Sequence, residues 1–274
     1  MIIDTLIIDT GSSNTWIGAG KAYNKTSTSH DTGNTVVCLS CFMLFTSYLK
    51  GDQSVSYGTG SFSGEEWSDT VTLGPGLIIR NQSIGVANLS ADFNGFDGIL
   101  GVGPVDLTSN SVSNTGTVPT VLDNLLSQGT ISEEVLGIYY APVSESSSNG
   151  ELTLGEYDSS VITSSVKYVP LTTTYPASKF WGINQSISYG NITILNSTAG
   201  IVDTGTTLIL IATGECCTET HYSLASYIGT RRCVPKIPVC NGRNSGRYHW
   251  TSRRFLLSIF QASDAVVQHW RHIL

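Results

Sequence analysis

The triplet Asp-Thr-Gly occurs twice in the chain, at residues 9–11 and at residues 203–205. Each copy follows a short apolar run, Leu-Ile-Ile in the first case and Gly-Ile-Val in the second, and each precedes small hydroxyl residues. A single copy would be an ordinary turn, because Asp and Gly are common turn residues. Two copies in matching contexts predict two related halves, each of which contributes one carboxylate to a shared site.

Such a pair of carboxylates, Asp9 and Asp203, has a definite chemistry. Two carboxyl groups within about 3 Å of one another cannot both ionise easily, so they share one proton. The ionised group can activate a water molecule while its protonated partner polarises a carbonyl oxygen. The pair therefore predicts hydrolysis of an acyl bond without a metal or a covalent intermediate, and it titrates as a unit.

The elements that position these carboxylates are expected to be strands. The chain has 274 residues, with 28 Gly, 12 Tyr and only 13% charged residues, which is typical of short strands and polar turns. Short apolar-polar alternations punctuated by Gly, Asn and Pro run through residues 69–87, 150–160 and 165–195. We therefore expect an all-β fold with few helices.

One helix is expected within residues 117–132. Its apolar side chains would share one face, and Gly129 would end it. The four residues expected on that apolar face are Val121, Leu122, Leu125 and Leu126.

Charge and targeting signals limit the class of partner. The formal net charge of −7 argues against nucleic acid and anionic membranes as partners, and no apolar run approaches the ~20 residues of a membrane span. The first residues do not read as a signal peptide. Six N-glycosylation sequons nevertheless favour a secretory glycoprotein. Their asparagines are Asn24, Asn81, Asn88, Asn184, Asn191 and Asn196.

The charge balance changes abruptly along the chain. Residues 1–213 contain 6 Lys/Arg and 18 Asp/Glu, whereas residues 214–274 contain 8 Lys/Arg and 3 Asp/Glu. Four of the five His lie in the second stretch. The six Cys are confined to that stretch and to one short run near residue 40. A single domain maintained by natural selection seldom shows so uneven a distribution of charged residues, His and Cys along its sequence.

Four motifs give the chain a resemblance to the pepsin-like aspartic peptidases, in particular to their secreted fungal, polyporopepsin-like branch. "DTGSSNTWIGAG" and "AGIVDTGTTL" resemble the two catalytic motifs of that family. "SVSYGTGSFSG" resembles the flap hairpin, and "FDGILGVGP" resembles the segment that passes beneath the first aspartate. The resemblance covers residues 1–36 and 53–213, and it implies a bilobal pepsin-like fold.

The resemblance also implies roles for individual residues. Asp9 and Asp203 match the catalytic dyad, and Ser12 and Thr206 match hydroxyls that bond to it. The flap and substrate-binding positions match Tyr57, Gly58, Thr59, Gly60, Trp16 and Ile99. Tyr57 would close over the substrate with the Trp16 indole supporting it, and Ile99 would line the apolar pocket beside the scissile bond.

The chain departs from the family in three places. It begins after the expected first strands, residues 37–52 match no family segment, and residues 214–274 do not continue the family pattern. We therefore expect an N-terminal lobe at 1–140 with a non-native insertion at 37–52, a partial C-terminal lobe at 141–213, and an aberrant tail at 214–274 outside the fold. We also expect this chain as it stands to be inactive and rapidly trimmed within the tail.

The resulting functional prediction is an aspartic endopeptidase that is active at acidic pH on polypeptide substrates. We expect a secreted monomer that uses no cofactor and no metal. The cysteines do not fit a standard zinc site, because the C-x-x-C of Cys38 and Cys41 has no matching partner pair and the spacing of the tail cysteines is irregular.

Two alternative functions remain open at this stage. The first is a non-catalytic relative that binds protein or carbohydrate, which the intact pair of triplets and Tyr57 argue against. The second is a single-motif lobe that dimerises, which the presence of both motifs in one chain argues against.

Overall fold

The computed structural model describes residues 4–37, 61–91, 93–140, 150–162, 164–189 and 192–206, together with the backbone of residues 266–269. Within these residues strands predominate, as the composition predicts. The described part contains no helix that is long and apolar enough to cross a membrane. Nearly all of the expected insertion at 37–52, the flap residues 57–60 and Asn191 lie outside the described residues.

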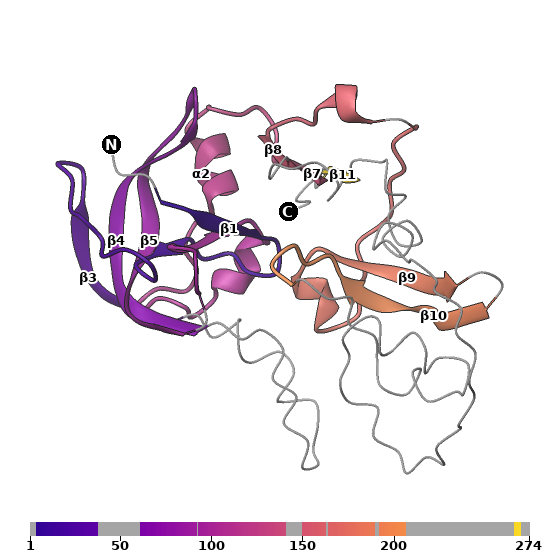
Figure 1. Cartoon of the computed structure of the whole chain (residues 1–274), viewed down its shortest axis with the longest axis horizontal. Coiled ribbons are helices and arrows are strands. Elements are labelled where there is room, and N and C mark those ends of the chain that lie inside the picture. The colour runs from indigo at the N-terminus through magenta and orange to yellow at the C-terminus, as the bar shows by residue number, and fades with distance from the viewer. Residues whose placement is uncertain are drawn as a thin grey trace, which may run out of the picture.

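Figure 1 shows a strand-rich N-terminal lobe on one side and a long hairpin of the C-terminal lobe on the other. The N-terminal lobe is built on a six-stranded sheet in the order β1-β6-β2-β5-β4-β3. β1 and β6 pair in parallel, which brings two segments far apart in sequence to one edge of the sheet. The strands are β1 (Leu6–Asp9), β2 (Trp16–Ile17), β3 (His30–Val37), β4 (Ser61–Gly74), β5 (Leu77–Ala91) and β6 (Gly98–Gly101).

β4 and β5 form the long antiparallel hairpin that the sequence predicts over residues 69–87. The turn between them is Pro75–Gly76, and Gly76 has a φ of 80°. Proline fixes the φ that the first central position of a turn needs, and glycine tolerates the positive φ of the second. The turn chemistry therefore specifies where this hairpin reverses.

The expected helix is α2 (Val121–Ser127), and it begins at a capping box in which Thr120 and Asp123 bond reciprocally. Gly129 has a φ of 71° just beyond the helix, as expected for a stop. One part of the prediction is wrong, because Leu126 is 38% exposed while the other three expected core residues are buried. The apolar stripe is one residue narrower than the sequence pattern indicated.

Beyond the six-stranded sheet the chain forms a two-stranded and a three-stranded sheet. The first pairs β9 (Gly182–Tyr189) with β10 (Ile192–Ile201), and the second has the order β11-β7-β8. β7 (Val135–Tyr140) is its central strand, and it pairs antiparallel with both neighbours. These neighbours are β8 (Gly150–Leu154) and β11 (Val266–His269). Short 3-10 turns occur at η1 (Val105–Thr108), η2 (Ser159–Val161) and η3 (Ala177–Lys179).

β11 differs from the expectation that all of residues 214–274 stay outside the fold. Val266–His269 pair in register with β7, with His269 opposite Val135. The outer edge of β7 offers unpaired backbone donors and acceptors, and a Val-Val pair suits an extended backbone. Four residues of the expected tail therefore add a strand to the sheet, and the rest of residues 214–274 lies outside the described part.

The hydrophobic core connects the six-stranded sheet to the three-stranded sheet. One buried cluster joins α2 and the N-terminal sheet to β7 and β8, through Leu125, Val102, Leu136 and Leu154 among others. A second cluster gathers around Trp16, Phe62 and Ile99. Since each fully buried aliphatic or aromatic side chain stabilises the fold by roughly 1.5–3 kcal/mol, these clusters hold the ends of β1 and β6 in place.

Candidate active site

The first triplet forms a tight turn at the end of β1 that encloses the Asp9 carboxylate. Asp9 is the last residue of β1 and is only 7% exposed. Its Oδ1 accepts the backbone N–H of Gly11 at 2.8 Å, and its Oδ2 accepts the hydroxyl of Ser12. The residues that follow Asp9 in the motif thus supply a hydrogen-bond donor to each of its carboxylate oxygens and hold the carboxylate in one orientation.

The second triplet repeats this arrangement just after β10. Asp203 Oδ1 accepts the backbone N–H of Gly205 at 2.9 Å, and Oδ2 accepts the hydroxyl of Thr206 at 2.6 Å. In both copies the amide donor lies two residues after the aspartate and the hydroxyl donor lies three residues after it. The two carboxylates therefore have matched local environments, although they are 194 residues apart.

The middle threonines of the two triplets connect the turns to each other. The backbone N–H of Thr10 donates to Thr204 Oγ1 at 3.0 Å, and the N–H of Thr204 donates to Thr10 Oγ1 at the same distance. Each hydroxyl then donates to a carbonyl of the other turn, Thr10 to Val202 and Thr204 to Ile8, at 2.7 Å in both cases. Four reciprocal hydrogen bonds hold the two aspartates in register across the lobes.

The aspartates approach each other so closely that the glycines beside them are required. A Cβ atom on Gly11 would lie 2.6 Å from Asp203 Oδ1, and one on Gly205 would collide with Asp9 Oδ1. Burial, and then the charge of Asp203, raise the pKa of Asp9 to about 6, while the Ser12 hydroxyl opposes that shift. The arrangement is a close pair of carboxyl groups in which Asp9 is buried and Asp203 is half-buried.

Trp16 and Ile99, which were expected near the substrate, lie in the core beneath this site. Trp16 is 1% exposed, stacks on Phe62 at 4.2 Å between ring centroids and meets Phe93 edge-on. Its indole N–H has no acceptor among the described residues. Ile99 is 6% exposed and lies opposite Trp16 in the sheet. The support of Tyr57 by Trp16 and the role of Ile99 as a pocket wall stay predictions.

Sequence reasoning missed residues that act through the fold rather than through a local motif. The crossing bonds of Thr10 and Thr204 were not predicted, although the repeated triplet itself was a signal for them. Tyr140, at the end of β7, also lies beside the site. Although Tyr140 is 65% exposed, desolvation of its phenol raises the pKa of that group, a hydrogen bond with Thr204 opposes this, and both aspartates add to the rise.

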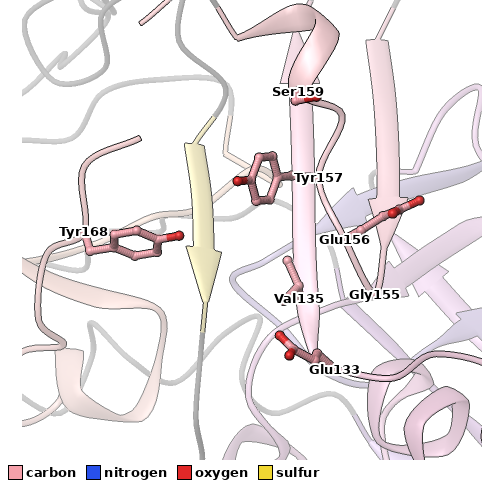
Figure 2. A pocket seen from close by; sticks show the side chains of 7 residues that line it. All are labelled: Glu133, Val135, Gly155, Glu156, Tyr157, Ser159 and Tyr168. Carbon is pink, nitrogen blue, oxygen red and sulfur yellow. The ribbon is translucent and has the colours of Figure 1, made fainter. Parts of the chain in front are cut away.

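A separate pocket lies at the other end of β7, away from Tyr140. It has a volume of about 350 Å³, and Figure 2 shows Glu133 and Glu156 at its rim and β11 running between Tyr157 and Tyr168. Its glutamates are exposed, and no group of three or more metal-ligating side chains occurs among the described residues. The pocket therefore adds nothing to the carboxyl pair.

Comparison with known proteins agrees with the geometry. Residues 4–230 match the family model "Eukaryotic aspartyl protease". The chain is 58% identical over 212 residues to polyporopepsin from Irpex lacteus, covering 76% of this chain and 57% of that protein. It is 34% identical over 221 residues to rhizopuspepsin-1 from Rhizopus niveus, covering 75% of this chain and 50% of that protein.

The fold comparison leads to the same family. The crystal structure of an aspartic proteinase from Irpex lacteus matches with a TM-score of 0.69 and 52% identity, covering 81% of this chain and 60% of that one. This confirms the expected all-β, pepsin-like fold. The chain spans only about half to three-fifths of the length of these relatives. With a matching family model over most of its residues, the chain belongs to the eukaryotic aspartyl protease family.

Proposed function

We propose that this chain carries the site of an aspartic endopeptidase, in which Asp9 and Asp203 hydrolyse peptide bonds at acidic pH. The observation that carries the proposal is the matched pair of carboxyl groups, each bound by a glycine amide and a hydroxyl of its own turn. Hydrogen bonds that fix a carboxylate's orientation prepare it for proton transfer at a set position. The substrate class that fits this chemistry is a polypeptide.

The reaction divides between the two carboxyl groups. The ionised group removes a proton from a bound water, whose oxygen attacks the peptide carbonyl carbon. The protonated group donates its proton to the carbonyl oxygen, and a tetrahedral diol forms. As the diol collapses and the C–N bond breaks, the newly protonated carboxyl group gives its proton to the leaving nitrogen. The other carboxylate takes the proton of a diol hydroxyl, so the pair again holds one shared proton.

Ser12 and Thr206 are proposed to orient the dyad, and Tyr57, Gly58, Thr59 and Gly60 to form the flap. A non-catalytic binding protein on the same fold is less well supported, because both motifs keep their hydrogen-bond donors. Burial, and then the charge of Asp203, raise the pKa of Asp9, and that cost serves no evident purpose in a passive binding surface.

The test uses the chain of residues 1–274 and a denatured protein substrate between pH 2.5 and 7. The sequence predicts that this chain is inactive as it stands, so the proposal concerns the site: any cleavage that the chain shows should be greatest in acid and should disappear in Asp9→Asn and in Asp203→Asn. Ser13→Ala is a suitable control, because its hydroxyl bonds to the Pro104 carbonyl and not to either carboxylate. Cleavage that survives either asparagine substitution would contradict the proposal.

Secretion, a monomeric state and N-glycosylation complete the proposal. The asparagines of the five sequons within the described residues are all exposed, and Asn81, Asn88 and Asn196 lie at irregularities in strand register. At such positions the strand bends and the side chain turns away from its neighbours. Mass mapping of the protein secreted from a eukaryotic host, before and after enzymatic deglycosylation, tests these sites, and unmodified asparagines throughout would contradict them.

A further inference from the structure

Trp181 lies at the junction of the two lobes, immediately before β9. Its indole Nε1–H donates to the carbonyl of Val102 at 2.9 Å, a bond that joins positions 79 residues apart. Its own carbonyl accepts the backbone N–H of Val202 at 2.9 Å. One residue thus contacts the N-terminal lobe through its side chain and the strand end of the C-terminal lobe through its backbone.

Both of these partners adjoin a catalytic carboxylate. Val202 directly precedes Asp203, and the backbone N–H of Val102 donates to the carbonyl of Asp9 at 2.9 Å. Three hydrogen bonds therefore run from Asp9 through Val102 and Trp181 to Val202. In Figure 1 the start of β9 and the end of β10 face the end of β1, where this chain of bonds crosses between the lobes.

The two ends of this connection are firmly held. Val102 is 0% exposed and packs in the cluster that contains α2 and β7. On the other side Gly182, next to Trp181, pairs with Ile201 in the β9–β10 hairpin. Because each end is fixed to a packed element, the indole hydrogen bond sets a spacing between elements rather than adjusting a loop.

From this geometry we infer that Trp181 is a positioning residue for the dyad, holding the turn of Asp9 and the turn of Asp203 at their working separation. This role rests on the proposed function. It differs from that of Thr10 and Thr204, which bond the two turns directly. Trp181 instead braces the backbone behind each turn, so its loss leaves the four threonine bonds in place and changes the spacing behind them.

The neighbouring contact between the lobes is of a different kind. Lys179 pairs with Asp106 at 2.7 Å, but both side chains are about half exposed. Exposed ion pairs are screened by water and contribute little to the stability of the fold. The indole bond of Trp181 is partly buried and less exposed to water, so it is the contact in this segment that can fix the separation of the carboxylates.

The test compares Trp181→Phe with Trp67→Phe in the full chain. Trp67 is a buried indole, only 5% exposed, whose N–H has no acceptor among the described residues, whereas Trp181 is half-buried. The two variants lose the same atoms, and only the first loses a hydrogen bond that the structure shows. If Trp181→Phe does not fold, benzothienylalanine at position 181 keeps the shape of the ring and removes only the donor.

Where the unaltered chain shows turnover, we expect Trp181→Phe to lower kcat about tenfold with KM within about twofold, because misplaced catalytic groups weaken the transition state more than substrate binding. The alkaline limb of the pH profile should move to lower pH, since carboxyls that are farther apart repel less. Amide hydrogen exchange in residues 98–103 should quicken about tenfold, since the Val102 segment loses its brace. Trp67→Phe should change none of these three measurements.

Equal effects of the two substitutions on exchange and on the pH profile would overturn the inference. The exchange measurement does not require activity. Cleavage by the unaltered chain that survives Asp203→Asn would contradict the proposed function alone. With or without cleavage, the exchange comparison decides whether Trp181 braces the Val102 segment.

Discussion

Asp9 binds its proton more tightly in the folded chain than in the unfolded one, because burial and then the charge of Asp203 raise its pKa to about 6. Between about pH 4 and pH 6 the folded state therefore holds more protons than the unfolded state, and the free energy of unfolding falls as the pH rises. The full change is on the order of 3 kcal/mol, reached above about pH 6. Below about pH 4 both states are protonated, and Asp9 no longer makes stability depend on pH.

We predict that Asp9→Asn removes most of this dependence, because an amide does not titrate. Urea unfolding at pH 4, 5, 6 and 7 measures it, with Glu151→Gln on the exposed face of β8 as the control for loss of an unrelated carboxylate. A stability curve in Asp9→Asn that falls as steeply as in the unaltered chain would show that the carboxyl pair is not its source.

At the scale of single residues, the sequence predicted the interactions within each motif but not the hydrogen bonds between residues far apart in the chain. Asp9 and Asp203 could be named from the repeated triplet, and Ser12 and Thr206 from the resemblance of the surrounding motifs, because each motif is a short local sequence. Trp181 could not, because its acceptor is 79 residues away and depends on how the lobes meet. The periodicity and spacing of residues in a single sequence do not show how the two lobes pack against each other.

At the scale of elements, α2 supports the site from behind. Val121, Leu122 and Leu125 pack in the same cluster as Val102, whose N–H binds the carbonyl of Asp9. The helix has only seven residues, so its first turn depends strongly on the capping box. Loss of that box should loosen the packing beneath β6.

We predict that Thr120→Ala lowers the free energy of unfolding by about 1 kcal/mol, because the N–H of Asp123 loses its acceptor in a buried place. Ser127→Ala, at the exposed end of the same helix, should change stability by less than about 0.5 kcal/mol. Chemical denaturation of both variants measures the difference. Equal stabilities would mean that the cap contributes nothing to the fold.

Elements were predicted best where turn chemistry or a cap marks their ends. Pro75–Gly76 located the β4–β5 reversal, and Gly129 located the end of α2. β11 was not predicted, since its pairing depends on an open edge of β7 and not on any pattern of its own. The exposure of Leu126 was missed for a related reason, because the width of an apolar face is set by what packs against it.

At the scale of the whole molecule, the connection between β3 and β4 is the feature that most needs a test. β3 ends at Val37, which pairs with Ser63, so the two strands are direct neighbours in the sheet. The chain between them comprises residues 38–60, which include both the unmatched cysteine-containing run and the flap residues. Whether that run is a passive insertion stays a prediction from the sequence.

We predict that deletion of residues 38–52 stabilises the chain and increases whatever cleavage activity the chain retains. Shortening the connection from 23 to 8 residues lowers the entropic cost of closing it by about 1 kcal/mol. It would also tie Tyr57 closely to β3, so that the flap is held nearer to the dyad. Replacing the same 15 residues with a Gly/Ser linker of equal length distinguishes the effect of the length of the connection from the effect of its sequence. A passive insertion predicts that the linker variant behaves like the unaltered chain, whereas a stability loss in both variants would make the run a working part of the fold.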